Sequence, residues 1–293
     1  MDRKNFLKSS LITAIAATFA PRTFELNNSD RENSTFDLLK QKVGYNHLSN
    51  KNIKTMNTVL HKADTRGNAD HGWLKSRHTF SFANYHNPER MNFGVLRVLN
   101  DDQVSENQGF GTHPHRDMEI VSIPLEGDLK HKDNMGNETV IKQGDIQVMS
   151  AGTGIMHSEY NSNPDKAVKF LQIWIIPNKQ NVQPRYDQIT LDTEDRKNKL
   201  QQILSPNADD AGVWIHQNAW FNMTNLDQGK EVTYNINDPK NNGVYAFILK
   251  GDVTINGQKL NLRDGFGVWD TDKLDIKADS DTEILLMEVP MSL

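Results

Sequence analysis

Short runs of alternating apolar and polar residues dominate the chain from Thr58 onward, and glycine-centred turns separate many of them. Many short strands at this spacing are typical of an all-β barrel or sandwich. One stretch, 194–204, has a helical pattern, because Leu200, Ile203 and Leu204 would share one side of a helix. The sequence therefore predicts an all-β protein with one short helix. The expected strands are 93–99, 119–125, 145–149, 169–176, 244–249, 253–255, 266–269 and 283–289.

The second half of the chain echoes the first half. The sequence LEGD at 125–128, followed by Gln143-Gly144, recurs as LKGD at 249–252, followed by Asp264-Gly265. This repeat indicates two related barrels. We expect the connection between them near Pro184, with one domain at 57–184 and the other at 185–293.

Two short clusters offer metal ligands, His113-Pro-His115 and His157-Ser-Glu159. In an extended strand, residues two apart point to the same face. The segment between the clusters is strand-like and contains turn signals, so the chain can fold back and bring both pairs together. An isolated pair of histidines is weak evidence, but here glycine-rich segments flank both clusters. Three imidazoles and one carboxylate are therefore expected to converge on one point.

The residues around these clusters carry a resemblance to a known family. The segment 109–161, which contains GFGTHPHRDME and SAGTGIMHSEYN, is similar to the metal-binding signature of the pirin family within the cupin superfamily. The segment HGWLKSRHTFSFANY at 71–85 resembles the start of the same family's first domain. The likeness extends over about 58–290 and is greatest to bacterial members described as quercetin 2,3-dioxygenases. It implies a bicupin, with two β-barrel or jelly-roll domains in one chain.

Carried over residue by residue, the family's metal ligands fall on His113, His115, His157 and Glu159. Glu119 stands where many other cupins keep their carboxylate ligand, but the pirin pattern uses the later glutamate. The resemblance implies one divalent transition metal, with Fe²⁺ expected first and copper, manganese, nickel, cobalt or zinc as alternatives. The chain has no cysteine, so imidazole and carboxylate are its strong ligands.

The second domain is expected to lack a metal site. Counting from its glycines places Asn237, Pro239, Ala278 and Ser280 at the four ligand positions. Outside the four ligands, Asp117 and Glu119 could orient ligands, although Asp117 could equally be an exposed turn residue. A lone histidine is rarely a ligand, so His131 is not assigned to the site.

The pirin resemblance implies a metal-dependent dioxygenase whose partners are a flavonol-like aromatic substrate and dioxygen. The flavonol ring would be opened and carbon monoxide released, with Glu159 as the catalytic base. Two alternatives stay open: a metal-binding regulatory protein, as in eukaryotic pirins, or a cupin enzyme that acts on another substrate. The protein is expected to be a monomer.

Charge and the N-terminus complete the sequence-based interpretation. A formal net charge of −5 without a basic block argues against nucleic-acid binding. Residues 1–20 have a basic start and an apolar run too short to span a membrane, in the order of a secretory signal. The start RKNFLK at 3–8 resembles a twin-arginine signal with lysine in place of the second arginine. We therefore expect export, to the periplasm, with the cytoplasm as the alternative, and a flexible linker at 21–56.

Overall fold

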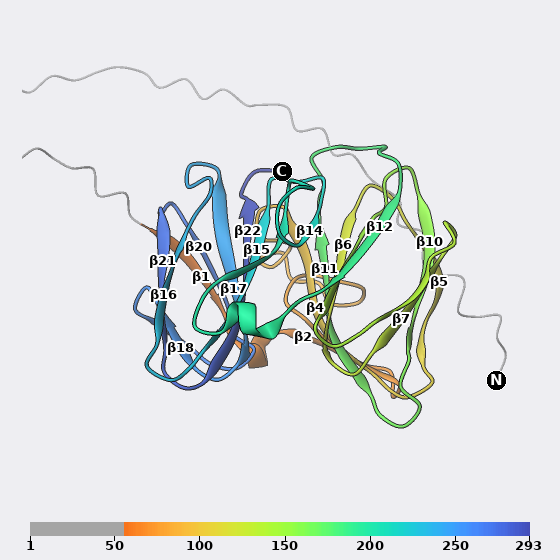
Figure 1. Ribbon diagram of the computed structural model, residues 1–293, viewed down its shortest axis with the longest axis horizontal. Coiled ribbons are helices and arrows are strands. Elements are labelled where there is room, and N and C mark those ends of the chain that lie inside the picture. The colour runs from red at the N-terminus through yellow and green to blue at the C-terminus, as the bar shows by residue number, and fades with distance from the viewer. Residues whose placement is uncertain (1–55) are drawn as a thin grey trace, which may run out of the picture. The chain divides into compact units, whose positions relative to one another are not determined.

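The computed structural model describes residues 56–293, which form two β-barrels (Figure 1). The predicted all-β architecture with two barrels is confirmed. The predicted signal peptide, 1–20, and all but the last residue of the predicted linker, 21–56, lie outside the described residues. Export therefore stays a prediction. In the part of the chain that is described, no helix is long and apolar enough to cross a membrane.

The first barrel consists of a seven-stranded and a four-stranded sheet, both antiparallel. The seven-stranded sheet contains, in spatial order, β12 (Arg185–Thr190), β9 (Asp145–Ser150), β6 (Glu119–Glu126), β11 (Val168–Ile175), β4 (Leu96–Val104), β3 (Leu74–His78) and β2 (Gly67–Asp70). The four-stranded sheet contains β5 (Gly109–His115), β10 (Ile155–Asn161), β7 (Leu129–Asp133) and β8 (Glu138–Ile141).

The second barrel repeats this arrangement. Its seven-stranded sheet contains β1 (Asn57–His61), β20 (Gly265–Trp269), β17 (Asn242–Lys250), β22 (Thr282–Pro290), β15 (Trp220–Leu226), β13 (Gln201–Ser205) and β14 (Val213–Trp214). Its four-stranded sheet contains β16 (Glu231–Asn235), β21 (Lys273–Ala278), β18 (Val253–Ile255) and β19 (Gln258–Leu260). Two 3₁₀ helices complete the described elements, η1 (Ala63–Thr65) and η2 (Thr193–Arg196).

The repeated glycine turns join equivalent strands in the two barrels. Gly127 follows β6 and Gly251 follows β17, and both have a φ of 74°. A side chain at Gly251 would also place its Cβ 2.2 Å from the backbone oxygen of Asp281. Only glycine adopts this backbone conformation without strain and permits this close approach. The repeat in the sequence therefore marks the same turn in each barrel.

A central hydrophobic core is shared by the seven-stranded sheets of both barrels. Leu99, Ile173 and Leu171 from the first sheet belong to the same buried cluster as Phe221 and Phe247 from the second. A separate apolar core fills the second barrel. Smaller clusters lie within the first barrel. The two barrels are thus held together by one continuous core.

Two strands lie outside the domain ranges drawn from the sequence. β1 falls in the range 57–184 but pairs with β20 of the second barrel. β12 falls in the range 185–293 but pairs with β9 of the first barrel. Alternation of apolar residues identifies a strand but not the sheet edge that it joins, so sheet membership differs from the boundaries at 57 and 185.

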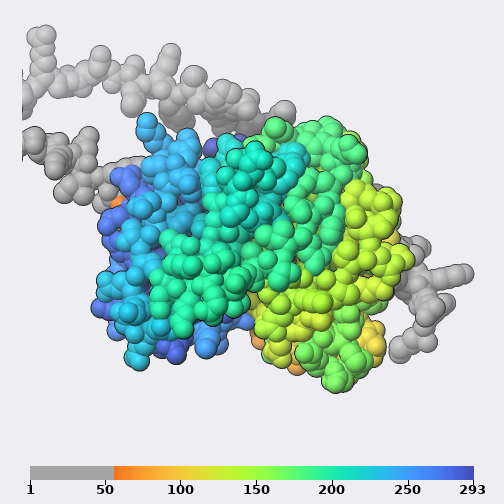
Figure 2. All heavy atoms as spheres, in the orientation of Figure 1, coloured from red at the N-terminus to blue at the C-terminus, as the bar shows by residue number. Residues whose placement is uncertain are grey.

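The helix predicted at 194–204 is wrong. η2 ends at Arg196, and the chain then extends into β13, which pairs with β15. Ile203 and Leu204 are fully buried in the central core, whereas Leu200 packs against the core of the second barrel. A short apolar run fits either a helix or a strand, and packing against β15 decides between them. This part of the chain, after β12, passes from one barrel to the other on the face seen in Figure 2.

Truncation of a central-core side chain should destabilise both barrels together. Phe247→Ala removes a fully buried ring, and we expect the free energy of unfolding to fall by about 3–5 kcal/mol. Lys259→Ala, at an exposed position of the same barrel, should change it by less than about 0.5 kcal/mol. Chemical denaturation, monitored by tryptophan fluorescence and by circular dichroism, measures the free energy of unfolding of both variants. Loss of structure in only one barrel would contradict a shared core.

Candidate metal centre

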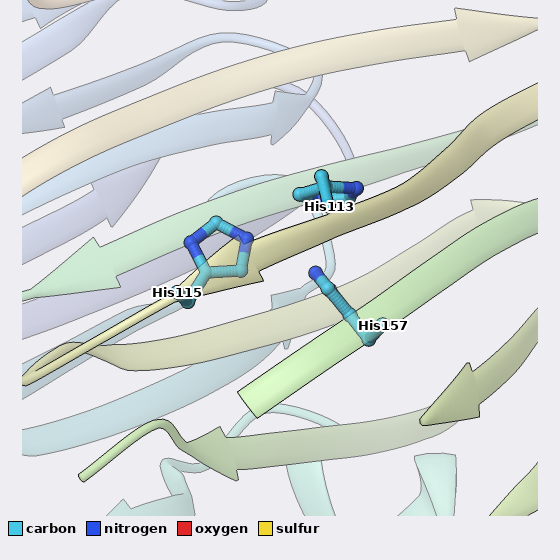
Figure 3. A group of neighbouring side chains, drawn as sticks. All are labelled: His113, His115 and His157. Carbon is cyan, nitrogen blue, oxygen red and sulfur yellow. The ribbon is translucent and has the colours of Figure 1, made fainter. Parts of the chain in front are cut away.

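Pairing of β5 with β10 brings the two histidine clusters together. The strands are antiparallel, with His113 directly opposite His157. His115 lies two residues after His113, so its side chain is on the same face of β5. The three imidazoles are turned toward a common space (Figure 3).

The nitrogen atoms of these histidines are close enough to share an ion. One ligand nitrogen from each of His113, His115 and His157 lies within 4.8 Å of the others. The ring centroids are 4.4 to 4.9 Å apart. Two nitrogens bound to one ion at about 2.1 Å lie up to about 4.2 Å apart. A small adjustment of the side chains is therefore enough for all three to bind one divalent ion.

Burial keeps His115 and His157 neutral. Desolvation, together with the neighbouring imidazoles, lowers the pKa of each to about 3. A neutral imidazole has a free lone pair, as metal binding requires. His157 Nε2 is buried and has no hydrogen-bond partner among the described residues. A buried polar atom without a partner is rare, and a metal ion is the partner that this atom fits.

Hydrogen bonds on the far side of the rings select the ligand nitrogen. His113 Nδ1 donates to the backbone oxygen of Gly111 at 2.8 Å. This bond places the proton on Nδ1 and leaves the Nε2 lone pair for a metal. His115 instead packs edge-on against Trp174, with ring centroids 4.9 Å apart.

His131, which sequence reasoning left out, orients His157. His131 Nε2 lies 3.1 Å from Asp133 Oδ2, and a carboxylate can only accept, so Nε2 carries the proton. His131 Nδ1 is then the acceptor for His157 Nδ1, 3.5 Å away, at the long end of the hydrogen-bond range. The chain from Asp133 through His131 therefore fixes the tautomer that leaves His157 Nε2 free.

Asp133 is itself held in place. Its Oδ1 accepts the backbone amides of Met135 and Asn137, and its Oδ2 accepts the Asn137 side chain. Desolvation acts to raise the pKa of this carboxyl, but the hydrogen bonds from Asn137 and His131 outweigh it and hold the pKa below its usual value. The spacing of His131 and Asp133, two residues apart in an alternating strand, was the available signal in the sequence.

Glu159 lies beside the histidines but outside their cluster. It is buried and lines the same cavity as His113 and His115. Its carboxylate accepts Gln172 Nε2 at 2.8 Å and Ser122 Oγ at 3.3 Å. The structure therefore brings together three of the four predicted ligands, and direct ligation by Glu159 stays a prediction.

The other carboxylates considered from the sequence lie elsewhere. Glu119 is buried and accepts Ser150 Oγ at 2.7 Å. Burial raises its pKa to about 7. Asp117 has a positive φ of 44° and accepts the backbone amide of Asn181, as a turn residue does. Neither lines the cavity beside the histidines.

Comparison with known proteins identifies the family. A family model described as Pirin matches residues 59–175, and one described as Quercetinase C-terminal cupin domain matches residues 202–289. A protein of Escherichia coli O157:H7 named Quercetin 2,3-dioxygenase is 46% identical over 231 residues, which cover 79% of this chain and 98% of that protein. The chain belongs to the pirin family. The predicted bicupin fold is confirmed.

Two crystal structures from Escherichia coli extend this likeness within the pirin family. The structure of YhhW has a TM-score of 0.76 and 45% identity, and covers 80% of this chain and 97% of that one. The structure of bacterial pirin YhhW in complex with nickel(II) has a TM-score of 0.75 and 44% identity, and the match covers 80% of this chain and 99% of that one.

The second cupin domain of this pirin-family chain has other residues at the ligand positions. Strand register places Tyr234 and Ile236 where the first barrel has His113 and His115, and Leu274 and Ile276 where it has His157 and Glu159. All four lie in the apolar core of that barrel. Counting from the glycines gave different residues because the second barrel has more residues between β16 and Gly251, and fewer between Gly265 and this part of β21, than the first barrel has at the equivalent places.

Loss of His131 should weaken metal binding without removing a ligand. In His131→Ala, the tautomer of His157 is no longer fixed, and we expect the metal affinity to fall about 10–100-fold. Lys132→Ala, at an exposed position of the same strand, is the control and should keep the affinity of the unmodified protein. Competition with a chromophoric chelator measures both. Equal affinities for the two variants would contradict the role of His131.

Proposed function

We propose that this pirin-family protein is a metal-dependent dioxygenase that opens the central ring of a flavonol such as quercetin with dioxygen and releases carbon monoxide. The observation that carries the proposal is the convergence of three histidines beside a cavity that also contains a carboxylate and aromatic walls. The name of the 46% identical Escherichia coli relative, quercetin 2,3-dioxygenase, supports the choice of reaction.

His113, His115 and His157 would hold the ion, with Glu159 as a fourth ligand. We propose Fe²⁺ as the resident ion; copper, manganese, cobalt, zinc and the nickel(II) bound by the Escherichia coli relative are alternatives. Three neutral imidazoles and one carboxylate leave a divalent ion with one positive charge. A bound ion of this kind lowers the pKa of a hydroxyl that it coordinates.

Glu159 would take the hydroxyl proton. Its residue lines the cavity, and its carboxylate accepts hydrogen bonds from two side chains, Ser122 and Gln172. A carboxylate within reach of the substrate hydroxyl can act as a general base. Removal of that proton gives the electron-rich flavonolate that reacts with oxygen.

The cavity suits a flat aromatic substrate. It has a volume of about 220 Å³, and Phe82, Phe110 and Trp174 line it. Phe82 and Trp174 contact each other edge to face, with ring centroids 5.4 Å apart. Rings held in this way offer apolar surfaces for stacking with a flavonol. Phe80 and Phe93 lie in the central core and not at this cavity.

Incubation of metal-loaded protein with quercetin under air tests the proposal. We expect loss of the flavonol absorbance, uptake of oxygen and release of carbon monoxide. Intact quercetin with every candidate metal would overturn the proposed reaction. His113→Ala and His157→Ala should lose both metal and activity and should keep the β fold.

Glu159→Gln should separate metal binding from turnover. The amide has the shape of the carboxylate and can still bond with Gln172 and Ser122, but it is not a base at neutral pH. We expect the variant to retain metal, with some loss of affinity, and kcat to fall about 10²–10⁴-fold. Elemental analysis and steady-state kinetics measure the two effects. Glu106→Gln, on the exposed loop between β4 and β5, is the control and should keep full activity. Full activity of Glu159→Gln would contradict its role as the base.

A further inference from the structure

The cavity beside the histidines has a polar wall on the sheet opposite the metal centre. Ser76 and His78 on β3 pair with Asp102 and Asn100 on β4, respectively. All four side chains are at most 5% exposed, and all four line the cavity. The histidine cluster belongs to the four-stranded sheet, whereas these residues belong to the seven-stranded sheet.

Several atoms of this wall lack a partner. Asn100 Oδ1 and His78 Nδ1 are buried without a hydrogen bond among the described residues. Ser76 Oγ donates to Asp102 Oδ1, and no described residue donates to Asp102 Oδ2. Buried polar atoms are normally paired, so unpaired ones in a cavity mark a place for a ligand group. Because Asn100 Oδ1 and Asp102 Oδ2 are acceptors, the complementary ligand group is a donor.

His113, His115 and Asp102 line one cavity from opposite sheets. A single molecule in this cavity can therefore contact the histidines with one group and Asp102 with another. An aromatic compound with a hydroxyl at each end matches both sites.

We propose that Asp102, with Asn100, forms a subsite for a second hydroxyl of the aromatic substrate, away from the metal, and thereby determines specificity for polyhydroxylated compounds. This inference rests on the proposed function and names a feature of its substrate. A phenolic hydroxyl that donates to a carboxylate makes a charge-assisted hydrogen bond, which is stronger than a neutral one. Burial raises the pKa of Asp102 to about 7 in the absence of a ligand. A donor bound to the carboxylate would favour its ionised form.

Binding in the absence of oxygen tests the subsite without turnover. Quercetin and 3-hydroxyflavone share the 3-hydroxyl and the 4-carbonyl, but 3-hydroxyflavone lacks the hydroxyls on the outer rings. We expect metal-loaded protein to bind quercetin at least about tenfold more tightly than 3-hydroxyflavone. Quenching of tryptophan fluorescence measures both affinities. Equal affinities in the unmodified protein would overturn the subsite without the need for a variant.

Asp102→Asn tests the residue itself. The variant keeps the shape of the side chain and an oxygen for Ser76, but turns an NH₂ group toward the ligand. We expect the preference for quercetin to fall about tenfold and the affinity for 3-hydroxyflavone to stay the same. Asp165→Asn, on an exposed loop, should leave both affinities unchanged. An equal loss of affinity for quercetin and for 3-hydroxyflavone, or no loss of affinity for either, would overturn the role of Asp102.

The outcome for the subsite is separable from the outcome for the reaction. Selective binding that depends on Asp102, without turnover under air, would support the subsite and overturn the dioxygenase proposal. Turnover without a preference between the two flavonols would support the reaction and overturn the subsite. Binding of neither flavonol would overturn the subsite.

Discussion

The register between β5 and β10 is the constraint on which the metal centre depends. His113 stands opposite His157, and this pairing places both histidines of β5 over the histidine of β10. A shift by one residue would turn His113 and His115 to the other face of the sheet. The register changes between His157 and Glu159, where Glu159 pairs with Phe110. The extra residue lies in β5, because β10 keeps its regular pairing with β7 across both positions, so Glu159 stays on the same face as His157.

The two barrels share a strand order but differ in what lies inside them. The interior of the first barrel carries unpaired polar atoms, such as Asn100 Oδ1 and His157 Nε2. Each buried atom of this kind costs about 1–3 kcal/mol when it has no partner. The second barrel is filled by an apolar cluster, and the central core joins it to the first. Burial of apolar surface in these two cores offsets the cost of keeping a polar cavity open in the first barrel.

Much of the fold and part of the site could be predicted from the sequence, because both depend on local patterns. Alternation along the strands gave the all-β class, and residues two apart gave the shared face of His113 and His115. What the sequence lacked was information on distant contacts. The role of His131 depends on the pairing of β7 with β10, and residues 201–205 form a strand because they pair with β15. Neither pairing can be read from the local sequence. The ligand positions of the second barrel were missed for a related reason, since counting residues assumes equal loops.

The position of β1 links completion of the fold to the end of the chain. The strands that carry the metal ligands end at Asn161, and the sheet opposite them is complete at Thr190. Yet β1 precedes all of them, and among the described strands it pairs with β20 alone. His61 on β1 also bonds to Tyr245 Oη at 2.8 Å. Until β17 and β20 have been synthesised, β1 lacks its partner strand, and the first barrel's large sheet lacks the part of its apolar cover that β17 and β22 supply. The histidines can therefore converge before the protein is complete, but the core that holds their barrel in place closes last.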